Sequence, residues 1–100
     1  MARTLEDIYQ EIADSIVESI SDNWSKAIVT AEIEDDHGTL QCEYQKTSRS
    51  SFVSFDCEYK MYKAFKELRA VFQEEGKQPW SKAEFTLKSD GTFNLSFEYD

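Results

Sequence analysis

The sequence predicts an α+β fold: an antiparallel sheet of about five strands with two helices packed on one face, in the order α-β-β-β-α-β-β. Two observations carry this prediction. Two segments repeat apolar residues at the helical period, whereas the segments around them alternate apolar and polar residues, as half-buried strands do. A chain of 100 residues with 14% aromatic residues is expected to form a single domain over 1–100.

The first helix is predicted from residue 5 to just before Asp22. Thr4 can cap it, and Glu6 and Asp7 favour its positive N-terminal end. Its apolar positions share one face: Leu5, Ile8, Tyr9, Ile12, Ile16 and Ile20. A second set, here called the helix stripe, falls roughly opposite that face: Asp7, Glu11, Asp14 and Glu18.

Three strands are predicted next. Residues 29–34 and 40–45 alternate around an acidic turn at 35–38, in which Gly38 is free to adopt a positive φ. A polar loop at 46–51 leads to a third strand over 52–57, in which Val53, Phe55 and Cys57 share one face.

The second half repeats the pattern of a helix followed by strands. A helix is predicted over about 58–75, with Gly76 as its stop and Pro79 blocking any continuation. The last hairpin joins residues 83–87 to 93–99 through a turn at 89–91. Trp24 and Trp80 each precede a strand and are predicted to plug the ends of the sheet, with partner contacts as the open alternative.

The charge balance constrains the partner. Acidic residues outnumber Lys and Arg by 20 to 11, which gives a formal net charge of −9. This charge argues against nucleic acid or an anionic membrane as partner and favours a basic protein. No apolar run approaches a membrane span and the first residues do not resemble a secretory signal, so a cytoplasmic location is expected.

Few residues offer chemistry. In a reducing compartment, Cys42 and Cys57 are expected to be buried free thiols, with pairing between them left open. His37 is the only imidazole, and neither metal-ligand spacing nor a glycine-rich phosphate loop is present. We therefore expect no enzyme activity, no metal, no cofactor and no small-molecule substrate.

Charged residues on the outward phase of the strands form one candidate binding surface. By alternation this face carries Glu84 and Glu98 from the last hairpin, with Lys88 as its only clear cation. The predicted partner-binding residues, here called the sheet-face set, come from the first three strands: Glu32, Glu34, Glu43, Phe52 and Asp56. Phe52 would be the apolar anchor. The helix stripe is the alternative surface. For each surface, a role in solubility alone explains the charged residues as well as partner binding does.

Five short segments of the chain match a known pattern: 8–13 (IYQEIA), 22–26 (DNWSK), 80–85 (WSKAEF), 91–93 (GTF) and 97–100 (FEYD). Together with the order of elements, which agrees along nearly the whole chain, they resemble the YezG-like immunity (antitoxin) family. The resemblance implies a small acidic bacterial protein that neutralises a secreted toxin, often a nuclease, in interbacterial competition such as contact-dependent growth inhibition.

The resemblance and the charge lead to one expectation, an immunity protein that binds a basic nuclease domain stoichiometrically. Two other classes stay open. One is a non-catalytic acidic adaptor or chaperone for a basic partner, and the other is a small enzyme that uses surface carboxylates.

Overall fold

The computed structural model describes residues 4–20, 23–34, 37–74, 76 and 80–99. The elements follow one another as α1 (Leu5–Ser19), β1 (Lys26–Ile33), β2 (Gly38–Gln45), β3 (Val53–Ser54), α2 (Tyr59–Glu74), β4 (Lys82–Lys88) and β5 (Phe93–Glu98). No helix in the described part of the chain is long and apolar enough to cross a membrane.

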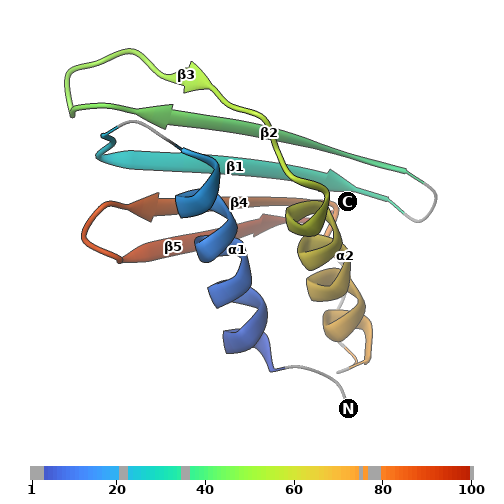
Figure 1. The fold of residues 1–100 in the computed structure, drawn as a ribbon. Coiled ribbons are helices and arrows are strands. Elements are labelled where there is room, and N and C mark those ends of the chain that lie inside the picture. The colour runs from blue at the N-terminus through green and yellow to red at the C-terminus, as the bar shows by residue number, and fades with distance from the viewer. Residues whose placement is uncertain (1–3, 21–22, 35–36, 75, 77–79, 100) are drawn as a thin grey trace.

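The strands form one antiparallel sheet in the order β3-β2-β1-β4-β5. Both helices lie side by side on one face of it, and the opposite face is open (Figure 1). This arrangement confirms the predicted α+β fold. The sequence pattern did not identify the edges of the sheet, and the structure shows them to be β3 and β5.

The core lies between the helices and the sheet. The predicted stripe of α1 contributes Ile8, Ile12 and Ile16, all fully buried. Trp80 is also fully buried, with its ring 6.4 Å from that of Phe65 and 5.7 Å from that of Phe97. Trp80 is therefore a core residue, whereas Trp24 is only partly buried against the core.

The predicted start of α1 and the predicted stop of α2 agree with the structure. Thr4 and Asp7 form a capping box, in which the Asp7 N–H donates to Thr4 Oγ1 at 3.1 Å and the Thr4 N–H donates to the Asp7 carboxylate. After α2, Gly76 has a φ of 78°, and its N–H donates to the Gln73 carbonyl oxygen at 3.1 Å. Pro79 lies outside the described residues.

The two hairpin turns have different outcomes. The turn between β4 and β5 is confirmed: Gly91 has a φ of 93°, and Asp90 accepts hydrogen bonds from the N–H and hydroxyl of Thr92. Gly38 does not use its freedom to adopt a positive φ, because it begins β2 in an ordinary strand conformation. A Cβ at Gly38 would lie 2.8 Å from the Tyr62 hydroxyl oxygen, so this position requires glycine for space.

The third strand is shorter than predicted. Only Val53 and Ser54 pair with β2, opposite Tyr44 and Glu43, whereas the prediction had six residues. The chain then leaves the edge of the sheet to reach the start of α2 (Figure 1). Alternation alone does not show how many residues find a partner strand.

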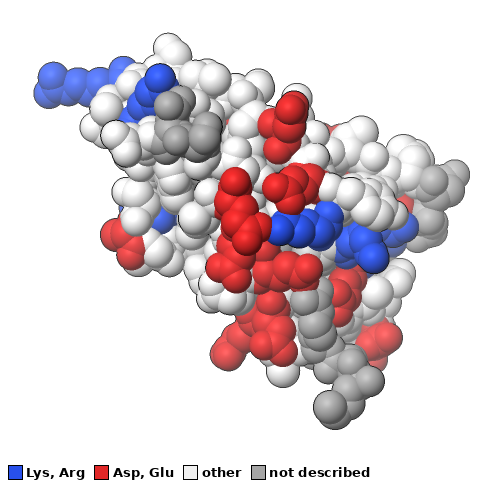
Figure 2. All heavy atoms as spheres, viewed as in Figure 1, with Lys and Arg blue, Asp and Glu red and all other residues white. Residues whose placement is uncertain are grey.

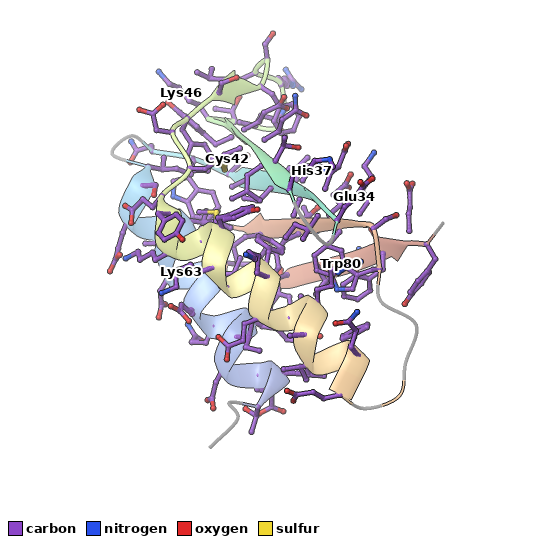
Figure 3. All side chains as sticks on the ribbon, turned by 90° about the vertical axis from the view of Figure 1, so that its right-hand side faces the viewer. Glu34, His37, Cys42, Lys46, Lys63 and Trp80 are labelled. Carbon is purple, nitrogen blue, oxygen red and sulfur yellow. A yellow bond between two sulfur atoms is a disulfide. The ribbon has the colours of Figure 1, made fainter. Side chains whose placement is uncertain are left out.

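The predicted free thiols are wrong, because Cys42 and Cys57 form a disulfide with their Cα atoms 6.1 Å apart (Figure 3). Cys42 lies on the core face of β2, and the segment between β3 and α2 brings Cys57 back to it. The Phe55 N–H donates to the Cys42 carbonyl oxygen at 3.0 Å, which holds this segment beside β2.

Candidate functional site

The open face of the sheet carries alternate residues of the strands in transverse rows. At one end Thr39, Glu32, Lys82 and Glu98 lie side by side across β2, β1, β4 and β5. A polar hollow of about 390 Å³ lies at this end, and Glu34 and His37 also line it. Their side chains lie together there (Figure 3), with His37 Nε2 3.4 Å from Glu34 Oε2. In the part of the chain that the structure describes, no three His, Cys, Asp or Glu residues are placed to hold a metal ion.

The structure does not bring the sheet-face set together. Glu43 pairs with Ile28, four residues before Glu32 on β1, so the two glutamates lie about 13 Å apart along the strand. Asp56 follows β3 on the far side of β2, where it lines a shallow hollow with Glu43.

Phe52 lies at the opposite end of the face from Glu32. The Lys26 ammonium is 5.9 Å from the centre of the Phe52 ring, and Lys26 is six residues from Glu32 on the same strand, about 20 Å away. The side chain of Phe52 is 39% exposed. The predicted anchor is therefore accessible, but its charged neighbour is a cation.

The open face is also less acidic than predicted. Lys88 is not its only cation, because Lys26 lies opposite Lys88 and Lys82 lies between Glu32 and Glu98. Alternation in the sequence already assigns Lys26 and Lys82 to this face, but the predicted strands began too late to include them. The negative charge is concentrated at one end of the face.

The strongest negative charge of a single element is on α1. This helix contains five acidic residues and no Lys or Arg: Glu6, Asp7, Glu11, Asp14 and Glu18. Figure 2 shows acidic side chains gathered over the region where α1 lies, with basic side chains beside them toward α2. The helix stripe therefore gives α1 a predominantly acidic exposed face.

Where α1 meets α2, part of this charge is compensated. The Lys60 ammonium forms a close ion pair with Glu18 and a second, at 3.4 Å, with Glu58. The hydrogen bond and charge of Glu18 raise the pKa of Lys60 above its usual range. Two other α2 lysines, Lys63 and Lys66, lie over the rings of tyrosines on their own helix.

The other flank of α1 borders a groove that the sequence analysis missed. The groove lies between α1 and the turn that joins β4 to β5, has a volume of about 190 Å³, and is here called the α1 groove. On α1 it is lined by Tyr9, Ala13 and Val17, a row spaced by four residues beside the buried stripe. This spacing is visible in the sequence and could have indicated a second apolar row.

Comparisons with known proteins place this chain in a family. The sequence profile described as immunity protein YezG-like matches residues 5–59 and 51–100. The chain belongs to the YezG-like immunity protein family. The two matches overlap at 51–59, the segment that contains β3 and enters α2.

Two relatives agree with this family assignment. The chain is 31% identical over 110 residues to the Type VII secretion system protein EsaG of Staphylococcus aureus, covering 95% of this chain and 68% of that protein. It is 23% identical over 109 residues to the immunity protein YezG of Bacillus spizizenii, covering 94% and 68%. Membership of an immunity protein family implies neutralisation of a cognate toxin, so the expected partner is a protein.

Proposed function

We propose that this immunity protein neutralises a basic nuclease toxin by stoichiometric binding, with no chemistry of its own. A nuclease must hold a polyanion, so its active cleft is basic. The observation that carries the proposal is α1, which presents five acidic side chains and no basic one. Such a surface attracts a cationic cleft over a distance and can occupy it or bind beside it.

The sheet-face set and the helix stripe are the two surfaces that could make this contact. The helix stripe is favoured because its acidic residues lie on consecutive turns of one rigid helix. The sheet-face set is instead divided among three places and shares the open face with Lys26 and Lys82. The sheet-face set stays a prediction, and the charge-reversal experiment of the Discussion compares the two surfaces directly.

We also propose where the protein acts. The staphylococcal relative is named as a type VII secretion system protein, which supports a toxin that bacteria export toward competing cells. An immunity protein against such a nuclease has to act in the cytoplasm, where nucleic acid is exposed to attack.

We expect a toxin gene beside the immunity gene, and co-expression of the two tests the proposed function. Cells that express the toxin alone should lose viability and nucleic acid integrity, and this chain should restore both and co-purify with the toxin in a fixed ratio. Co-purification without protection would instead favour an adaptor or chaperone. Failure both to protect and to co-purify would contradict the proposal.

A further inference from the structure

Several apolar side chains that line the α1 groove are exposed to solvent and adjacent to one another, which is uncommon on the surface of a monomeric soluble protein. Val17 on α1 is 53% exposed and Phe93 at the start of β5 is 48% exposed, and both line the groove. Trp24 and Leu87 line it too. Adjacent exposed apolar residues with a polar rim are typical of protein interaction sites.

Rigid packing supports the groove from below. The ring of Phe93 stacks on that of the fully buried Phe85, with centroids 5.2 Å apart, and lies 5.8 Å from the ring of Tyr9. The α1 groove has a volume of about 190 Å³, which is larger than the volume of about 150 Å³ of a cavity that is known to accept benzene. One large apolar side chain of a partner therefore fits the groove.

Among the described residues that line the groove, the charged ones are Asp14 of the helix stripe and Lys88. On the α1 side, Gln10 donates to the Asp14 carboxylate at 2.8 Å, and a carboxylate has further acceptor positions for an incoming cation. On the opposite side the groove is lined by Lys88, which interacts electrostatically with Asp90 in the β4–β5 turn. Hydrogen bonds from Thr92 lower the pKa of Asp90, whose carboxylate is not part of the lining of the groove.

We propose that the α1 groove receives a basic segment of the toxin, which inserts one large apolar side chain between α1 and the β4–β5 turn and places Arg or Lys against Asp14. The acidic helix stripe along the α1 side of an apolar floor favours this occupant by charge complementarity. The proposal rests on the proposed function, since the toxin is the partner that immunity requires.

Two substitutions of equal charge test this contact. Val17→Arg places a large cation at the mouth of the groove, at an exposed position where the helix can tolerate it. Ala70→Arg on α2 is the matched control, because Ala70 is also exposed and helical but lies outside the groove. The probe is the nuclease domain encoded beside the immunity gene, inactivated by mutation and immobilised for binding kinetics.

We expect Val17→Arg to weaken binding about tenfold or more, as loss of a central interface contact does, and Ala70→Arg to remain close to wild type. Circular dichroism must first show that both variants fold. Hydrogen exchange of the wild-type complex should show new protection in α1 and in the β4–β5 turn.

The outcomes separate the two proposals. If the wild-type chain does not bind the nuclease domain at all, the proposed function fails and the groove proposal falls with it. If the wild-type chain binds and Val17→Arg binds equally well, or if protection appears on the open sheet face instead, immunity stands and the groove proposal is wrong.

Discussion

Gly38 and Tyr62 show how closely the start of β2 is packed against α2. A Cβ at Gly38 would lie 2.8 Å from the Tyr62 hydroxyl oxygen and 3.1 Å from the backbone carbonyl oxygen of Glu32. The Glu32 carbonyl oxygen belongs to the backbone of β1 and cannot move easily. The Tyr62 side chain can rotate away only by losing its contacts with the core. Space, and not backbone conformation, therefore fixes this glycine.

Gly38→Ala should lower the free energy of unfolding by about 1–3 kcal/mol, the usual cost of overpacking. Urea unfolding followed by circular dichroism measures this change. In a Tyr62→Phe background, which removes the nearest atom, the same substitution should cost less. An equal cost in both backgrounds would show that Tyr62 is not the obstacle.

The capping box at Thr4 gives a second prediction at the residue scale. Thr4→Ala removes the side-chain acceptor of the Asp7 N–H and should destabilise the protein by about 1 kcal/mol. Thr4→Ser keeps the acceptor and should stay close to wild type in thermal unfolding. If both variants behave alike, the hydrogen bond contributes nothing measurable.

Among the elements, those with strong local periodicity were predictable from the sequence. Four features depend on residues close together in the chain: the apolar stripes of α1 and α2, the alternation of β4 and β5, the helix stop at Gly76 and the hairpin turn at Gly91. The extent of β3 depends on how far β2 offers it a partner, which no local pattern contains. The disulfide was missed because the expected compartment was weighed above the possible approach of two core-facing cysteines.

The disulfide closes the segment from β2 to the start of α2, with a sequence separation of 15 residues. In the chain-entropy treatment, a loop of this length contributes about 3 kcal/mol. Reduction with dithiothreitol should therefore lower the free energy of unfolding by about this amount. Cys57→Ala should resemble the reduced protein and should not respond to the reductant.

A thiol assay of the native protein provides the control for this prediction. The oxidised chain should show no reactive thiol until it is reduced. Two titratable thiols in the untreated, unfolded protein, or unfolding that is indifferent to reductant, would contradict the disulfide.

For the whole molecule, the distribution of charge matters more than its sum. The open sheet face mixes Lys26, Lys82 and Lys88 with its glutamates, so it contributes little of the net charge of −9. Alternation predicted the acids of that face but missed two of its lysines because β1 and β4 extend beyond the predicted strands. The candidate site was therefore only partly predictable, since its charge depends on strand ends and on the neighbours that pairing brings together.

Association with the toxin should depend on salt. Raising the ionic strength from low to physiological screens exposed charges and should slow association, whereas buried contacts should keep the complex measurable. A standard interface takes about 800 Å² from each partner. That is about an eighth of the 6333 Å² surface of this molecule. Stopped-flow kinetics at several salt concentrations measures the effect, and an association rate indifferent to salt would argue against electrostatic capture.

The most direct test of the central claim, capture of a basic toxin by the acidic side of α1, compares two charge-reversal pairs. Glu11→Lys with Asp14→Lys changes α1, and Glu34→Lys with Glu43→Lys changes the sheet-face set. Each pair replaces two acids by two lysines and raises the formal charge from −9 by 4 to −5, so any difference between them reports position. After both are shown to fold, affinity for the inactivated toxin is measured. The account predicts that the helix pair weakens binding about tenfold or more and abolishes protection, while the sheet pair retains both. Loss of binding by the sheet pair alone would contradict it and return the interface to the open face of the sheet.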